Sequence, residues 1–136
     1  MQTRLNPYLN FKDNARQAME FYQSVFGGTV QVNTFKEFGA SQNPNEDDLV
    51  MHSILEADNG IVLMAADTPE HRPHSPGNNI SISLSGDNET ELRGYFEKLS
   101  AGANVMMQLE KASWGDTFGM LTDKFGIAWL VNVTQS

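Results

Sequence analysis

The chain has 136 residues, no cysteine and a formal net charge of −8 at pH 7. The length fits one domain of ordinary size, and the lack of cysteine excludes disulfides, thiolate zinc sites and cysteine nucleophiles. An acidic chain with 9 Lys and Arg lacks the basic surface that nucleic acid or an anionic membrane would require. No apolar run is long enough to span a membrane, and the first residues have no apolar signal core. We therefore expect a cytoplasmic protein.

Hydrophobic periodicity divides the chain into helices and strands. Both predicted helices begin after an asparagine, Asn14 or Asn88, and both end at glycine, which are common start and stop signals. In chain order we expect a strand at 5–11, a helix at 15–26, strands at 29–38, 49–57 and 61–66, a strand at 79–85, a helix between 88 and 102, and strands at 105–109, 117–122 and 127–133.

This order, one strand, one helix and three strands, occurs twice. The repeat is visible in the residues, since F-Y-Q-S-V-F-G-G at 21–28 matches Y-F-E-K-L-S-A-G at 95–102. D-N-G-I-V-L-M-A at 58–65 likewise matches K-F-G-I-A-W-L-V at 124–131. Such a repeat predicts an α+β fold of two βαβββ modules, with curved, mostly antiparallel sheets around a cavity. The predicted boundaries are a single domain at 1–136, with module one at 1–68, module two at 78–136 and a proline-rich loop at 69–77.

Several short motifs carry a resemblance to a known family. They are P-Y-L-N-F at 7–11, F-Y-Q-S-V-F-G-G at 21–28, M-H-S-I-L at 51–55, L-M-A-A-D at 63–67 and the closing hairpin at 114–132. In this order they resemble the vicinal oxygen chelate superfamily of glyoxalase I, extradiol dioxygenases and bleomycin-resistance proteins. Within it they resemble the PhnB-like branch, often labelled 3-demethylubiquinone methyltransferase-like. The predicted fold has no parallel sheet with a glycine-rich turn for S-adenosylmethionine, so we reject that label.

The resemblance also implies a homodimer and a divalent metal with four His, Glu or Gln ligands from the first and last strands of each module. The matching positions here are Asn6, Met64, Asn79 and Leu130. Amide oxygens and aliphatic side chains are poor ligands for zinc, nickel or iron. We expect no cofactor and no metal site, with a divalent metal as the alternative.

The candidate catalytic residues are His52 and Glu110. His52 is the histidine inside a predicted strand, and imidazole can act as a general base, a hydrogen-bond donor or a metal ligand. It could equally be a strand histidine whose ring is satisfied by the backbone. Glu110 precedes the Trp114 loop and is the carboxylate nearest the expected cavity edge of module two. His71 and His74 lie in a proline-rich loop, where a solvated turn is favoured over a metal pair.

The candidate ligand-binding residues are mostly aromatic or soft apolar side chains: Tyr8, His52, Met64, Trp114, Phe118 and Trp129. Strands have two faces, so some of these aromatics must instead pack against the helices. Trp114 is the best pocket candidate because it lies in a loop.

The sequence thus predicts a small-molecule-binding protein without the superfamily's usual metal quartet. One alternative is a metal-assisted lyase, isomerase or dioxygenase that uses His52 and Glu110. Another is a dimeric scaffold with a vestigial cavity.

Overall fold

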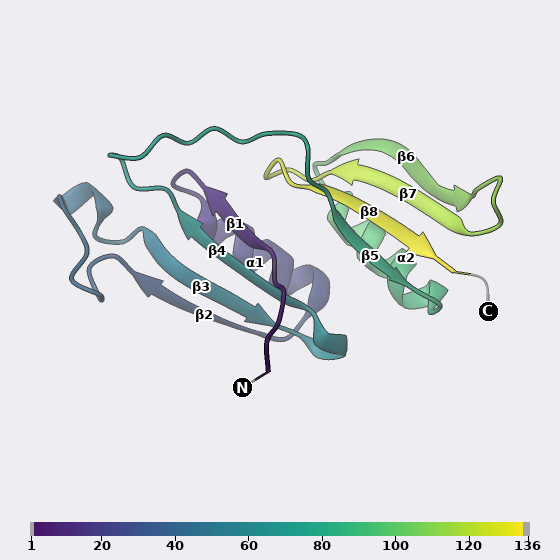
Figure 1. Ribbon diagram of the computed structural model, residues 1–136, viewed down its shortest axis with the longest axis horizontal. Helices are drawn as coiled ribbons and strands as arrows, with labels where there is room; N and C mark the ends of the chain where they lie inside the picture. The colour runs from purple at the N-terminus through teal and green to yellow at the C-terminus, as the bar shows by residue number, and fades with distance from the viewer. Residues whose placement is uncertain (1, 135–136) are drawn as a thin grey trace. The chain divides into compact units, whose positions relative to one another are not determined.

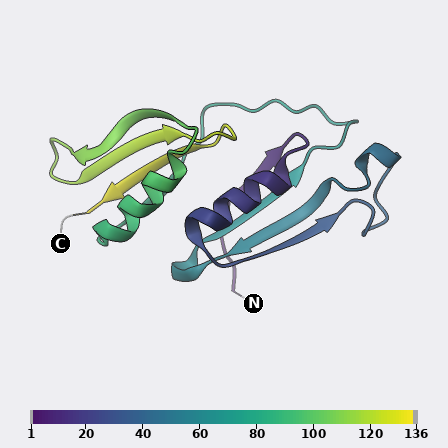
Figure 2. The same ribbon diagram turned by 180° about the vertical axis from the view of Figure 1, so that it is seen from behind.

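The computed structural model describes residues 2–134. The chain divides into two compact units, Met1–Pro76 and Gly77–Ser136, and each unit holds one strand–helix–three-strand module (Figure 1). Each unit has its own four-stranded sheet with one helix on one face, as the views from the two sides show (Figure 2). The predicted α+β class with paired βαβββ modules is therefore confirmed. Among the described residues, no helix is both long and apolar enough to cross a bilayer.

The first unit forms a mixed sheet in the strand order β1-β4-β3-β2. β1 runs parallel to β4, whereas the β4–β3 and β3–β2 pairs are antiparallel. Its helices and strands are β1 (Tyr8–Phe11), α1 (Ala15–Phe26), β2 (Thr29–Thr34), β3 (Val50–Glu56) and β4 (Val62–Asp67), with short 3-10 turns η1 (Pro44–Glu46) and η2 (Asp58–Gly60).

The apolar stripe of α1 packs on one face of this sheet. Leu9, Phe11, Leu63 and Ala65 on β1 and β4 are all at most 8% exposed, and they share this face. The buried residues of the helix recur at the predicted three-to-four-residue spacing: Ala15, Ala18, Met19, Tyr22, Val25 and Phe26. Burial of this stripe, rather than helix propensity, is what stabilises a helix of this length.

The start of α1 differs from the prediction. The side chain of Asn14 makes no capping hydrogen bond. The cap comes from the end of β4 instead, where Asp67 is 4% exposed. Its Oδ1 accepts a hydrogen bond from the Ala15 backbone N–H at 2.9 Å, and its Oδ2 accepts one from the Val50 N–H at 2.9 Å. One carboxylate thus joins the helix N-terminus, β4 and β3, where a negative charge also suits the helix dipole.

The second unit repeats the topology, with the strand order β5-β8-β7-β6 and β5 parallel to β8. Asn88 caps the helix as predicted, since its Oδ1 accepts a hydrogen bond from the Glu91 N–H at 3.1 Å. The elements are β5 (Ile82–Gly86), α2 (Glu89–Leu99), β6 (Asn104–Lys111), β7 (Thr117–Thr122) and β8 (Ala128–Val133).

The helix α2 lies close against its sheet at Gly119. A Cβ atom at this position would be 2.8 Å from Cε2 of Phe96 and 3.0 Å from the backbone of Leu109. This contact identifies which face of β7 and β8 is turned toward the helix. It also explains why a strand interior accepts a glycine, which otherwise weakens strands.

Three strands have one end displaced by three or more residues from the prediction. β1 begins at Tyr8 rather than at residue 5, and β5 begins at Ile82 rather than at residue 79. β2 ends at Thr34 because the chain turns there, with the Thr34 N–H donating to Glu37 Oε1 and the Glu37 N–H donating to Thr34 Oγ1. Local hydrogen bonds of this kind compete with strand pairing.

Candidate functional site

The face of the first sheet opposite α1 carries a row of polar and soft apolar side chains. Alternation along each strand places them there, because their neighbours are the core residues that pack on the helix. We call this surface the first helix-free face. It consists of Tyr8 and Asn10 on β1, Met64 and Ala66 on β4, His52 and Ile54 on β3, and Gln31 and Asn33 on β2.

Strand register sets which of these residues are neighbours. Tyr8 lies opposite Met64, and Met64 lies opposite Ile54. Ile54 in turn lies opposite Gln31 on β2. His52, two residues from Ile54, lies opposite Asn33. The register therefore brings three predicted ligand contacts, Tyr8, His52 and Met64, onto one surface.

Tyr8 and His52 form the polar centre of this surface. The Tyr8 Oη lies 3.3 Å from His52 Nδ1, and the ring centroids are 5.9 Å apart with a 35° tilt. The Tyr8 side chain thus reaches over β4 to β3.

The Tyr8 phenol can act as donor or acceptor in this hydrogen bond. Burial raises the pKa of the Tyr8 phenol above its ordinary value of 10.0, so the phenol keeps its proton at neutral pH. The phenol O–H donates when Nδ1 carries no hydrogen, and the phenol oxygen accepts when Nδ1 carries one, so the direction depends on the imidazole tautomer. In either case the contact uses Nδ1 and leaves Nε2 of His52 for another partner.

The corresponding face of the second sheet has a different chemical character. Phe118 lies opposite Glu110 on β6 and opposite Asn132 on β8. Trp114 is 62% exposed and meets Phe118 edge-on, with ring centroids 5.6 Å apart and a 64° interplanar angle. Three predicted site residues, Glu110, Trp114 and Phe118, therefore gather within the second unit, with the glutamate exposed on its strand.

Trp129 lies on the other face of the same sheet. It is 1% exposed and stands opposite Leu121, in the layer that packs on α2. Its Nε1–H donates to Oδ2 of the buried Asp123 at 2.8 Å. Of the two orientations that the sequence allowed for the aromatics, Trp129 takes the one toward the helix. It is a core residue of the second unit.

The positions that the resemblance assigns to metal ligands can now be located. Met64 and Leu130 are on the last strand of each unit, as expected. The residues directly opposite them on the first strands are Tyr8 and Ser83. Asn6 and Asn79, which the sequence suggested, precede those strands. Within residues 2–134, no three His, Cys, Asp or Glu side chains are grouped so as to hold a metal ion.

The proline-rich loop contributes one contact that sequence reasoning missed. Nε2 of His74 lies 3.2 Å from the backbone oxygen of Asn10, a β1 residue of the first helix-free face. His71, in contrast, is exposed. The two histidines therefore differ in environment, although the sequence treated them as a pair. No local signal in E-H-R-P-H-S-P marks which one reaches the sheet.

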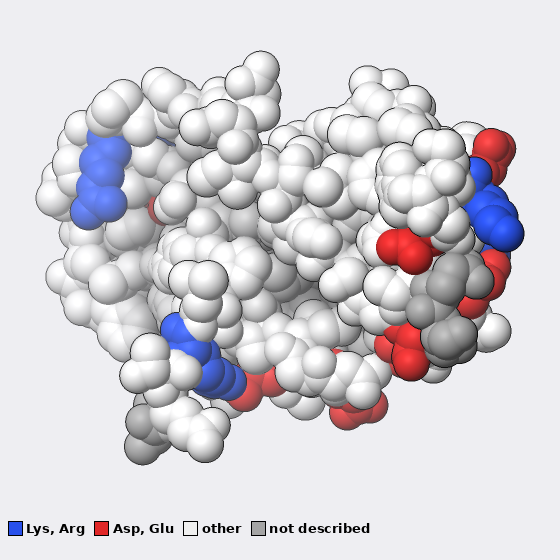
Figure 3. Space-filling model, turned by 45° about the vertical axis from the view of Figure 1, so that its right-hand side comes forward, with Lys and Arg blue, Asp and Glu red and all other residues white. Residues whose placement is uncertain are grey.

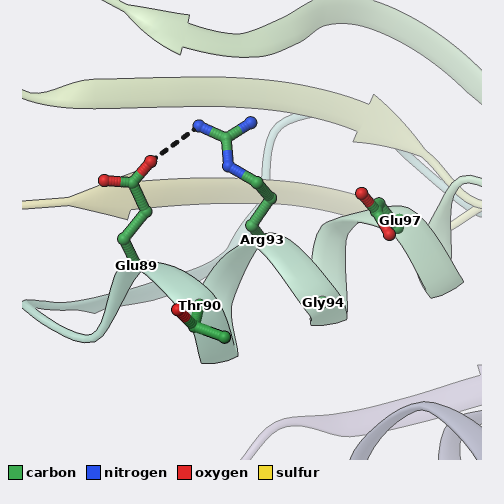
Figure 4. Close-up of a pocket in the computed structure, with 5 residues that line it drawn as sticks. All are labelled: Glu89, Thr90, Arg93, Gly94 and Glu97. Atoms are coloured by element: carbon green, nitrogen blue, oxygen red, sulfur yellow. Dashed lines mark hydrogen bonds and ion pairs between the residues drawn. The ribbon is translucent and has the colours of Figure 1, made fainter.

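A shallow hollow also runs along the solvent side of α2 (Figure 4), and its lining is Glu89, Thr90, Arg93, Gly94 and Glu97. Arg93 and Glu89 form an ion pair at 2.9 Å, one helical turn apart. Arg93 also donates to the backbone oxygen of Leu109 at 3.1 Å. Both charged side chains are about half exposed, so the pair is a typical surface contact and not a reactive cluster.

Taken together, the duplicated βαβββ topology and the unlike sheet faces define an α+β protein of two sheet-and-helix units. The sequence model of the Glyoxalase/Bleomycin resistance protein/Dioxygenase superfamily matches residues 4–131. The chain therefore belongs to this superfamily. The resemblance inferred from the sequence is thereby confirmed.

Individual relatives agree with this assignment. Protein YjdN of Escherichia coli is 25% identical over 96% of this chain and 95% of its own. Among solved structures, protein PA1353 from Pseudomonas aeruginosa is 36% identical, with a TM-score of 0.82 over 99% of this chain and 100% of its own. A PhnB protein from Bacillus cereus is 24% identical, with a TM-score of 0.77 over 97% of this chain and 100% of its own, which shows a shared fold.

Proposed function

We propose that the protein binds a small, uncharged and partly apolar molecule on the first helix-free face, with no resident metal. The hydrogen-bonded pair of Tyr8 and His52 is the observation that carries this proposal. Membership in a superfamily of small-molecule-binding proteins supports it.

The side chains around the pair suggest how a ligand would be held. Met64 and Ile54 offer apolar surface beside Tyr8, and methionine adapts to ligands of different shape. Nε2 of His52 would donate to, or accept from, a polar group of the ligand. Asn33, opposite His52, adds an amide that can donate or accept. A few placed polar groups on an apolar surface are typical of small-molecule sites.

The charge distribution favours an uncharged ligand. None of the eight residues that define the first helix-free face is acidic or basic apart from the imidazole. Much of the surface in view in Figure 3 likewise carries neither acidic nor basic side chains. The same alternation places Glu56 at the end of this face, four residues from His52. An anionic ligand would therefore find no countercharge, a cation would find one only at that end, and either would lose hydration on binding.

The absence of a metal follows in this proposal from the donor set. The paired first- and last-strand positions offer a phenol, a thioether, a hydroxyl and an aliphatic side chain at Tyr8, Met64, Ser83 and Leu130. Zinc, nickel and iron select imidazole, carboxylate or thiolate instead. We therefore derive no metal-assisted step. The alternative, a metal-assisted lyase, isomerase or dioxygenase with His52 and Glu110, would require a stoichiometric divalent ion in the purified protein.

The test is a thermal-shift screen of uncharged aromatic and heteroaromatic compounds. A ligand that binds the native state stabilises it by RT ln(1 + [L]/Kd) and so raises the melting temperature. Hits should lose affinity at least about tenfold in His52→Ala, since a buried hydrogen bond and ring contact contribute about 1.5 kcal/mol or more. His71→Ala, which removes an exposed histidine, is the matched control and should bind like the parent protein.

Two results would overturn the proposal. One is a set of hits whose affinity is the same in the parent protein, His52→Ala and Tyr8→Phe. The other is a stoichiometric divalent ion in protein purified without chelator that is lost in His52→Ala, which would favour the metal-assisted alternative.

A further inference from the structure

A second candidate site lies in the first unit, where the long connection between β2 and β3 folds back beside the start of α1 (Figure 1). The hollow there has a volume of about 310 Å³. It is lined by Lys12, Asp13, Asn45, Glu46, Leu49 and Glu70.

Glu46 is the unusual member of this lining. It is 3% exposed, although it belongs to the short turn η1 in a polar loop. Its Oε1 accepts a hydrogen bond from Asn43 Nδ2 at 3.2 Å. Its Oε2 is buried and has no hydrogen-bond partner within the described residues. A carboxylate oxygen that has lost its water without gaining a partner is uncommon in native structures and calls for an explanation.

The surrounding charges favour a cation. Asp13 and Glu70 also line the hollow, and the Asn43 amide that meets Glu46 lies 3.4 Å from Oε2 of Glu70. Lys12 is the cationic residue among the lining residues, against three carboxylates. Within residues 2–134 no ion pair joins Lys12 to Glu46. The hollow therefore has an excess of negative charge around an oxygen that still needs a donor.

The geometry points to an organic cation and not to a chelated metal. No three acidic or histidine side chains of the described chain are close enough together to coordinate a metal ion. The volume is about ten times that of one water molecule, which occupies roughly 30 Å³. A multi-atom ligand with one charged end fits both observations.

We propose that this hollow binds a primary ammonium group, and that the Glu46 side chain turns toward the hollow so that an N–H of the ligand donates to Oε2. A primary ammonium supplies both of the things that the site lacks, a positive charge and a hydrogen-bond donor. The side chain of Leu49 would contact the first methylene groups of the amine. This site is distinct in residues and chemistry from the first helix-free face, so the two proposals can fail independently.

The experiment is a titration followed by amide chemical shifts of the isotopically labelled protein. The probe is n-butylammonium. Tetramethylammonium is the matched control with the same charge but no N–H, and n-butanol is the control with the chain but no charge. Saturable shifts confined to residues 12–13, 43–49 and 70 are expected with n-butylammonium alone. Equal shifts with tetramethylammonium, or no saturable shift with n-butylammonium, would overturn the proposal.

Two variants locate the site. Glu46→Gln removes the charge and supplies its own donor, so it should weaken n-butylammonium binding at least tenfold. Asp48→Asn removes a charge from an exposed residue of the same loop and should leave binding within about twofold. Equal losses in both variants would show that only the general acidity of the loop matters, and would refute the proposal.

A third variant covers the case in which Glu46→Gln does not fold. Lys12→Ala keeps the carboxylate and removes the cationic residue that lines the hollow, so the affinity for n-butylammonium should rise. An unchanged or reduced affinity in Lys12→Ala would contradict the assigned role of Glu46. To separate a free amine from a lysine side chain as the natural source, the titration is repeated with N-acetyl-lysine methylamide. Failure of n-butylammonium to bind refutes the proposal. If it binds, tighter binding of N-acetyl-lysine methylamide at the same residues identifies a lysine side chain as the natural source, and weaker binding identifies a free amine.

Discussion

Replacement of Asp67 by alanine should destabilise the first unit by about 3–5 kcal/mol. The carboxylate is 4% exposed and accepts two backbone hydrogen bonds at 2.9 Å, from Ala15 and Val50. A hydrogen bond to a charged group contributes about 1.5–3 kcal/mol, so two of them give about 3–6 kcal/mol, and the expected loss lies in the lower part of that range. Its negative charge at the first turn of α1 adds to this through the helix dipole. Alanine would also leave both N–H groups buried without an acceptor.

The assay is urea unfolding of the parent protein and the Asp67→Ala variant, followed by far-ultraviolet circular dichroism. Both tryptophans, Trp114 and Trp129, belong to the second unit, so tryptophan fluorescence reports on that unit separately. Asp58→Ala is the control, because Asp58 is exposed in the η2 turn and its removal should change stability by less than about 0.5 kcal/mol. A loss below about 1 kcal/mol in Asp67→Ala would refute the assignment of the helix cap to this carboxylate.

Further predictions address the core, the backbone, the tyrosine and the assembly. Trp129→Phe removes the hydrogen bond to buried Asp123 and should lower the free energy of unfolding in urea by about 1–3 kcal/mol. Trp114→Phe, at an exposed site, should lower it by less than about 0.5 kcal/mol. Equal losses would contradict the core position of Trp129. Gly28→Ala should be destabilised by at least about 2 kcal/mol, because φ is +85° and the added Cβ would lie 2.2 Å from the Glu56 carbonyl oxygen; an unchanged unfolding midpoint would contradict this. In an ultraviolet absorbance titration, the phenolate signal lost in Tyr8→Phe should appear above pH 10.0, because burial raises the pKa of Tyr8. Since the phenol of the unfolded chain ionises first, this group lowers the stability of the fold as the pH rises above 10.0. A Tyr8 signal below that pH would refute the assignment. Sedimentation should show a homodimer of the 15.1 kDa chain, and a single species of monomer mass would remove that prediction.

The sequence was informative where the determining signals are local. The apolar stripe of α1 and the Asn88 cap of α2 depend on residues within one or two helical turns, and both were predicted. β7, at Thr117–Thr122, has the predicted bounds because turn residues flank it on both sides. The repeated topology followed from the same local signals in their repeated order.

The sequence was uninformative where the partner is distant in the chain. The hydrogen bonds of Asp67 reach back 52 residues to Ala15 and 17 residues to Val50, so no neighbouring residue in the sequence marks it as a helix cap. The orientation of Trp129 depends on which face of β8 meets α2, and a one-residue change of register would have reversed it. The pairing of Tyr8 with Met64 likewise depends on strand register, which is a tertiary property.

The two units show how one scaffold can carry two different surfaces. Matching registers place Leu130 where the first unit has Met64, Phe118 where it has His52 and Ser83 where it has Tyr8. The glycine turns and the helix-packing layers recur, but the phenol–imidazole pair does not. Core positions are constrained by packing in both units, whereas residues on a helix-free face can change without loss of the fold. The two faces differ in chemistry, with an imidazole and amides on one and aromatic side chains on the other. Because folding does not fix the residues at these positions, ligand binding can determine them.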